Sequence, residues 1–177
     1  MSEGLVIDWT PDYSLKWSDF KAESNPSVYE DSHSVVKYRF TWTVNSDIVD
    51  KKIMFLIDNI LLFVEFHPLL SWIRSESNAE LLLHEQGCFD LAELVKRENF
   101  TNLQDQFYHK YYPTRGQNEE QRKQFAKEDS GKMIASEIEK LQKLYDEKRK
   151  KYQEDTNFGQ NFDEQSKYDL LFKQLRQ

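Results

Sequence analysis

The sequence lacks the features that mark several broad classes of protein. It has a single cysteine, Cys88, so no internal disulfide can form and a reducing compartment suits the chain. Its longest apolar run, residues 53–66, is interrupted by Asp58, Asn59 and Glu65. Such a run is too short and too polar to cross a bilayer, so we expect no membrane span.

Acidic residues outnumber basic ones, and no export signal is visible. The chain carries 24 Lys and Arg against 31 Asp and Glu, which gives a formal net charge of −7. Because nucleic acids and anionic lipids repel negative charge, we expect neither as a main partner. Residues 1–14 show no basic segment followed by a long apolar stretch. We therefore expect no signal peptide, which favours a cytoplasmic location.

What is present indicates one folded domain over residues 1–177. Hydrophobic residues make up 38% of the chain and aromatic residues 14%, enough for a real core. Residues 36–44 alternate apolar and polar side chains, which predicts a half-buried strand. Residues 52–57 and 60–66 flank Asp58-Asn59, which predicts a hairpin of two buried strands.

The periodicity becomes helical after residue 77. Ser77 and Glu80 form a capping box that predicts a helix over about residues 78–98, apolar nearly all round and therefore buried. Residues 99–121 are predicted to be mostly irregular. A long amphipathic helix is expected over about 119–153, followed by a short last helix. The apolar seam of the long helix comprises Ile134, Ile138, Leu141, Tyr145 and Tyr152, and "EKRKK" at 147–151 is interpreted as part of its solvated face.

This order predicts an α+β fold. A small antiparallel sheet in residues 1–73 is followed by helices in residues 77–177 that pack on it.

The stretch "LLLHEQGC" at residues 81–88 places His84 and Cys88 four residues apart on the predicted buried helix. Residues at this spacing share a helix face, so imidazole and thiolate could both bind one zinc ion. Glu85 would then lie beside a metal-bound water as general base. The alternative is that Cys88 is a small buried hydrophobe. His84 and Glu85 are polar and need hydrogen-bond partners in either case. A thiol enzyme with Cys88 as nucleophile and His84 as base is a further alternative.

The same stretch resembles a family of uncharacterised, mostly bacterial predicted zinc-dependent proteases, whose helix reads HEQ-x-HFD-x-x-E. Further similarity lies in "LKWSDFK" at 15–21, in "LLSWI" at 69–73 and in the C-terminal segment, so it covers nearly the whole chain. Within the helix, Glu85, Gln86, Phe89, Asp90 and Glu93 match the family pattern, and Cys88 departs from it.

The resemblance implies a zincin-like fold and a peptidase origin. The family's Thr-x-His-Gly segment implies a third zinc ligand, but here Phe158 stands at that histidine between Thr156 and Gly159. Two of the three expected histidines are thus replaced, by Cys88 and Phe158. We expect a degenerate metal site without a cofactor, and a pseudo-peptidase that acts by binding peptide or protein.

Two alternatives remain open from the sequence. The first is an active zinc metallopeptidase with His84, Cys88 and an unidentified third ligand, for which His33, His67 and His109 qualify by residue type. The second is a helical interaction protein that uses its long charged helix. We expect a monomer, because the apolar seam of that helix should be used in the core. Relatives of this kind look largely extracytoplasmic, in contrast to the absence of an export signal here.

Overall fold

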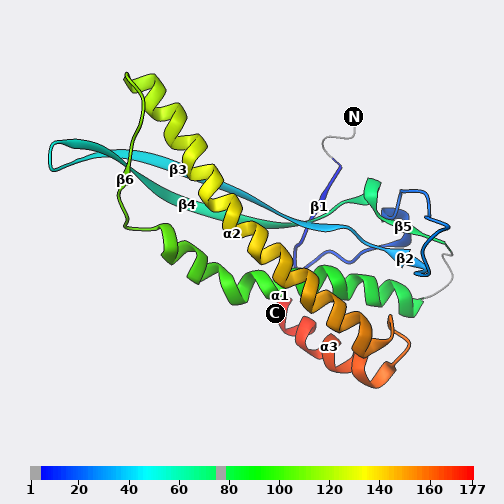
Figure 1. The fold of residues 1–177 in the computed structure, drawn as a ribbon. Coiled ribbons are helices and arrows are strands. Elements are labelled where there is room, and N and C mark those ends of the chain that lie inside the picture. The colour runs from blue at the N-terminus through cyan, green and yellow to red at the C-terminus, as the bar shows by residue number, and fades with distance from the viewer. Residues whose placement is uncertain (1–4, 75–78) are drawn as a thin grey trace.

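The computed structural model describes residues 5–74 and 79–177 and shows an α+β fold (Figure 1). The elements, in chain order, are β1 (Ile7–Asp8), η2 (Trp17–Asp19), β2 (Ser32–His33), β3 (Val36–Val49), β4 (Lys52–Phe66), η3 (Pro68–Leu70), β5 (Trp72–Ile73), α1 (Ala79–Phe107), β6 (Tyr112–Pro113), α2 (Glu119–Thr156) and α3 (Phe162–Leu175). A long two-stranded hairpin forms most of an antiparallel sheet, α1 and α2 pack against one of its faces, and α3 packs against these two helices.

The expected alternation in β3 is confirmed. Val36 is buried and Tyr38, Phe40, Trp42 and Val44 are half-buried, while the residues between them are exposed. This face contacts the helices because an apolar side chain at every second position lies on one side of a pleated strand. β4 lies in the middle of the sheet, paired with β3 along its length and with β1 and β6 near its ends.

The predicted hairpin at Asp58-Asn59 is wrong, because both flanking segments belong to the single strand β4. The turn lies instead at Asp50 and Lys51, which both have positive φ, of 50° and 67°. Positive φ at both central residues is the geometry of the tight turn that matches strand twist. Asn59 also has a positive φ, of 50°, and occupies a bulge where the β3–β4 register shifts opposite Thr41–Thr43.

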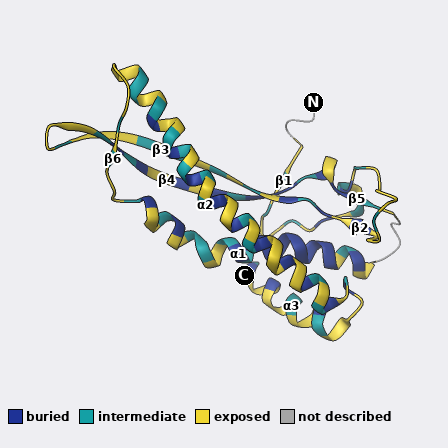
Figure 2. Cartoon of the chain, in the orientation of Figure 1, coloured by how far each residue is buried: buried dark blue, intermediate teal, exposed yellow. Residues whose placement is uncertain are grey.

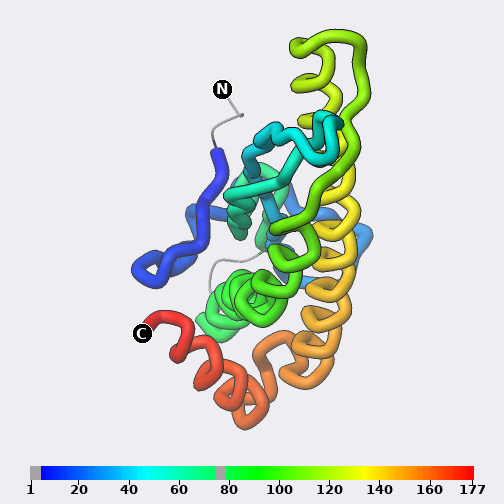
Figure 3. The backbone as a smooth tube through the Cα atoms, turned by 90° about the vertical axis from the view of Figure 1, so that its left-hand side faces the viewer, coloured from blue at the N-terminus to red at the C-terminus, as the bar shows by residue number. Residues whose placement is uncertain are grey.

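The predicted burial of α1 is confirmed. Every residue from His84 to Glu93 is buried, and this part of α1 is dark blue in Figure 2. A view close to the α1 axis explains why, since the sheet lies on one side of α1 and α3 on another, with α2 alongside (Figure 3). Ser77 of the predicted capping box lies outside the described residues.

Two helix boundaries differ from the prediction. α1 continues to Phe107 rather than ending near residue 98, because Leu103 and Phe107 extend its buried face beyond a run of polar residues. Residues 99–107 are therefore helical, not irregular. α2 ends at Thr156, and the following Asn157, Phe158 and Gly159 all have positive φ, which reverses the chain into α3. The seam predicted for α2 is buried in full.

Asp90 ties both ends of the described chain to α1. Its Oδ1 accepts hydrogen bonds from Trp9 Nε1 at 2.8 Å and Arg176 Nη2 at 2.6 Å. Gln86 Nε2 donates to the same oxygen at 2.9 Å. The conformations of residues near both termini thus depend on one buried carboxylate in the helix that also carries His84 and Glu85.

Candidate functional site

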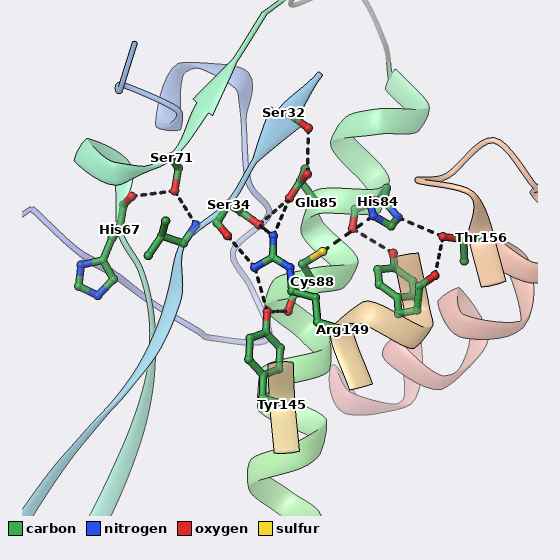
Figure 4. Close-up of polar contacts among 12 residues, drawn as sticks. Ser32, Ser34, His67, Ser71, His84, Glu85, Cys88, Tyr145, Arg149 and Thr156 are labelled. Carbon is green, nitrogen blue, oxygen red and sulfur yellow. Dashed lines mark hydrogen bonds and ion pairs between the residues drawn. The ribbon is translucent and has the colours of Figure 1, made fainter. Parts of the chain in front are cut away.

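α1 directs its three candidate site residues into two different environments (Figure 4). His84 and Cys88 lie one helical turn apart, with His84 Nε2 4.0 Å from Cys88 Sγ. Glu85 follows His84 by one residue and its carboxylate points instead toward Ser32 and Ser34. The helix therefore brings the imidazole and the thiol together but directs the carboxylate elsewhere.

His84 is enclosed by α2 and α3. Its ring stacks on Tyr152 with the centroids 4.6 Å apart and the planes at 8°. Nδ1 lies 3.3 Å from both Thr156 Oγ1 and Gln165 Oε1. Thr156 already donates its hydroxyl proton to the Tyr152 carbonyl, so both neighbours act as acceptors and the proton of His84 lies on Nδ1. Burial lowers the pKa of His84, which keeps the ring neutral.

Cys88 is fully buried, and this burial raises the pKa of its thiol to about 12. Metal ions and electrophiles react with the thiolate, which is scarce at neutral pH in such a site. The thiol faces the unprotonated Nε2 of His84 at 4.0 Å, a neutral and weak contact. This environment is that of a small buried hydrophobe, and it disfavours a nucleophilic role for Cys88.

Glu85 is held as a structural carboxylate with 1% of its surface exposed. Ser32 Oγ donates to Oε1 at 2.9 Å and Ser34 Oγ donates to Oε2 at 2.5 Å. Burial alone would raise the pKa of Glu85. The nearby Arg149 guanidinium and the two serine hydroxyls outweigh it, so the pKa lies below its ordinary value.

Arg149 of α2 completes this network. Its Nη2 lies 3.6 Å from Glu85 Oε2 and donates to Ser34 Oγ at 3.1 Å. Nη1 donates to the Ser34 carbonyl at 2.6 Å and to Tyr145 Oη at 3.4 Å. Tyr145 in turn donates to the Cys88 carbonyl at 2.8 Å. The network joins α1, α2 and the β2–β3 connection, and its one negative and one positive charge balance.

Phe158 lies beside His84, as the resemblance would place a third ligand. The rings are 5.7 Å apart at an angle of 55°. Gly159 permits this approach, because an added Cβ would lie 2.9 Å from the Glu80 carbonyl oxygen and 3.0 Å from His84 Cβ. Phenylalanine has no donor atom, so it contributes only apolar surface next to the imidazole.

The side chains around His84 do not fit a zinc ion. Zinc in proteins takes at least three ligands from side chains, and here His84 and Cys88 offer two. Glu85 is held by serines and Arg149, whose positive charge opposes a second cation. Across residues 5–74 and 79–177, no group of three or more His, Cys, Asp and Glu side chains is arranged to hold a metal ion.

The other histidines form no ligand cluster with His84 and Cys88 in the described part of the chain. His33 packs near Trp72, with ring centroids 6.4 Å apart, and lies close to the Glu85–Arg149 network, where burial and the charge of Arg149 lower its pKa. His67 Nε2 lies 4.0 Å from Glu65 Oε1 and is buried without a hydrogen-bond partner. His109 is exposed just after the end of α1. The expectation of a third ligand among these residues receives no support from their positions.

A groove opens next to the Glu85–Arg149 network. It lies between the start of β3 and the C-terminal half of α2 and encloses about 590 Å³. Its lining includes Val36, Tyr38, Ile138, Tyr145 and Arg149. Charged residues also line it, among them Glu30, Lys37, Glu139, Asp146 and Lys150, so apolar and charged surfaces meet in this groove. A volume in this range is typical of ligand sites.

Arg149 is the site residue that sequence reasoning missed. It lies within "EKRKK", which was expected to be a solvated face, but it is buried and the lysines around it are exposed. A signal was available, since Arg149 is four residues after Tyr145 and three before Tyr152, on the seam itself. Ser32 and Ser34 precede β3 and carry no comparable signal in the sequence.

Comparison with known proteins identifies no relative: no family model, curated protein or solved structure matches the chain. The resemblance to predicted zinc-dependent proteases therefore stays a prediction, as does the zincin-like character of the fold. Within the described part of the chain, none of the helices has the length and apolarity needed to cross a membrane.

Proposed function

We propose that this protein is a non-catalytic relative of zinc-dependent peptidases that binds peptide or protein in the groove between β3 and α2. In this proposal the helix that carries His84 and Glu85 is kept as a scaffold. Its polar side chains stabilise the wall of the groove rather than perform hydrolysis.

The observation that carries the proposal is the state of Glu85. A general base must reach the water or substrate proton and works best with a pKa near the operating pH. Glu85 is buried, bonded to two serines and next to Arg149, and its pKa is lowered. It therefore has neither the access nor the basicity that peptide hydrolysis requires.

The donor set around His84 supports the same conclusion. Burial keeps Cys88 as a thiol, and Phe158, which the resemblance assigns to the third ligand, has its ring centroid 5.7 Å from that of His84. Replacement of one ligand is compatible with an exchange of metal-binding groups, whereas loss of two leaves too few donors for zinc.

The groove gives the proposal its binding surface. Ile138 and Gln142 of α2 form one wall, and Val36 and Tyr38 of β3 form the other. Arg149, which is part of this lining, donates a hydrogen bond to Ser34 Oγ, which in turn donates to Glu85. In this proposal the balanced charges of Glu85 and Arg149 hold the wall of the groove in place and take no part in catalysis.

A hydrolysis assay tests the non-catalytic part. The purified protein is incubated with a quenched-fluorescent peptide library, with and without zinc and 1,10-phenanthroline. We expect no chelator-sensitive hydrolysis, and no difference between the wild type and Glu85→Gln. Hydrolysis that phenanthroline inhibits and Glu85→Gln abolishes would instead establish the active metallopeptidase.

Two matched tryptophan variants test the binding part. Gln142→Trp places a bulky ring in the groove, while Lys143→Trp places the same ring at the neighbouring exposed position. Peptides selected from a random phage-displayed library on the wild type should lose binding to Gln142→Trp and keep it with Lys143→Trp, measured by fluorescence anisotropy in EDTA. Equal binding by the two variants would place the binding surface elsewhere.

A further inference from the structure

One edge of β3 is left without a strand partner. β3 pairs with β4 on one side, and in the described residues no strand pairs with its other side, which faces α2. An exposed edge presents unpaired backbone N–H and C=O groups that favour the addition of another strand.

The direction of the backbone groups identifies which residues face the groove. Val35 directs its N–H to Ser71 Oγ and its carbonyl to the N–H of His67, on the β4 side. The carbonyls of Ser34 and Val36 point the other way and accept from Arg149 and Gln142 of α2. Because these directions alternate along a strand, Val36 and Tyr38 present their N–H and C=O groups toward the groove.

Side chains of α2 cover the edge only in part. Arg149 binds the Ser34 carbonyl at 2.6 Å, and Lys127 Nζ binds the Trp42 carbonyl at 2.7 Å. Between these positions Gln142 reaches the Val36 carbonyl at 3.5 Å, a long hydrogen bond that a ligand could displace. The groove of about 590 Å³ lies along this less protected part.

The two faces of β3 set different requirements on an added strand. A residue opposite Tyr38 would direct its side chain to the same face, toward Ile138 and Tyr145, which are buried and largely apolar. A residue opposite Lys37 would lie on the outer face. Lys37 is exposed, and the carboxylate opposite it in the ladder, Glu65, is bound to Arg39 at 2.8 Å.

We propose that the groove binds an extended peptide as an added strand on the β3 edge. The peptide has apolar residues opposite Val36 and Tyr38 and an acidic residue opposite Lys37. Backbone hydrogen bonds supply affinity and the alternating side chains supply specificity. This inference rests on the proposed binding function and names the ligand class of the same groove.

A random nonapeptide phage library tests the sequence preference. Selection on the wild type should enrich an apolar–acidic–apolar pattern, and Lys37→Glu should shift the central position to Lys or Arg. Lys52→Glu is the matched control, because Lys52 is exposed on the same sheet but lies outside the groove lining, and it should select the wild-type pattern.

Backbone methylation tests the binding mode. The most enriched peptide is synthesised in two forms, each N-methylated on one of the two alternating sets of amides. Since an added strand directs only one set toward β3, one form should lose affinity by about tenfold or more while the other changes little.

The outcomes separate this inference from the proposed function. Suppose that peptides lose binding to Gln142→Trp but are unaffected by Lys37→Glu, and that both methylated forms bind equally well. The added-strand mode would then be overturned, while the proposed binding function would stand. If no peptide is enriched on the wild type above the level on Gln142→Trp, both are overturned.

Discussion

The charge pair of Glu85 and Arg149 is the residue-scale feature on which the site depends. Glu85 and Arg149 are buried opposite charges that also bond to Ser34. Removing both should destabilise the protein less than removing one, because the single remaining charge would stay buried without compensation. The pair is expected to stabilise the protein only as a unit.

Glu85→Gln should therefore lower the free energy of unfolding by about 3 kcal/mol, because Arg149 is left unpaired. Urea denaturation measures the change, and the exposed Glu147→Gln on α2 serves as the control, with a change of less than about 0.5 kcal/mol. The double variant Glu85→Gln/Arg149→Met should be more stable than the sum of its single changes. Strict additivity would show that the two groups do not interact.

Phe158 and Cys88 permit a gain-of-function test of the resemblance. Cys88→His combined with Phe158→His should give three imidazoles around one point and bind about one zinc ion per chain, whereas each single change should not. Zinc content and the zinc-induced rise in melting temperature measure the result. A double variant that folds, as circular dichroism would show, yet binds no zinc would contradict the assigned position of Phe158.

At the scale of elements, the packing of α1 against α2 depends on Gly87. A Cβ at this position would overlap the hydroxyl of Tyr152 and lie 2.8 Å from Tyr152 Cζ. That hydroxyl cannot move freely, because it donates to the His84 carbonyl at 3.0 Å and accepts from Gln165 Nε2 at 2.8 Å. The close approach outweighs the higher helix propensity of alanine, about 1 kcal/mol.

Gly87→Ala should thus destabilise the protein by about 2 kcal/mol in urea denaturation. Removing the clashing hydroxyl in Gly87→Ala/Tyr152→Phe should recover part of the loss. If Gly87→Ala were more stable than the wild type, α1 and α2 could move apart without any loss of packing energy.

The elements show how far sequence reasoning reaches. Strand β3 and the seam of α2 follow from apolar spacing alone, because each is buried on one face. The signal at Asn59 misleads, since a bulge and a hairpin turn both need a residue with positive φ, and the true turn at Asp50-Lys51 has no glycine. Arg149 was hidden by the lysines around it, and only its place on the seam sets it apart.

Across the whole molecule, burial makes stability depend on pH. Burial lowers the pKa of His84, His33 and His67, so below the ordinary histidine pKa, about 6.5, the unfolded state binds more protons. Stability is thus highest above that pH and falls as the pH drops toward the lowered values. The lowered pKa of Glu85 adds a second loss, which begins below about 4.3, the ordinary value of a glutamate.

We expect the melting temperature to fall between pH 7.5 and pH 5.5, and His84→Gln to reduce this fall. Each proton taken up on unfolding lowers the free energy of unfolding by up to about 1.4 kcal/mol for each unit that the pH falls. The exposed His109→Asn should keep the wild-type dependence on pH. A pH profile that His84→Gln leaves unchanged would show that this ring does not contribute.

The central claim is that the helix bearing His84, Glu85 and Cys88 remains as a scaffold without a metal. It is tested most directly by the zinc content of the untagged protein after zinc loading and desalting, measured by plasma mass spectrometry. The account predicts far less than one zinc per chain, because two donors, one of them a buried thiol, do not make a zinc site. About one zinc per chain would contradict it and direct attention to a third ligand and to peptidase activity.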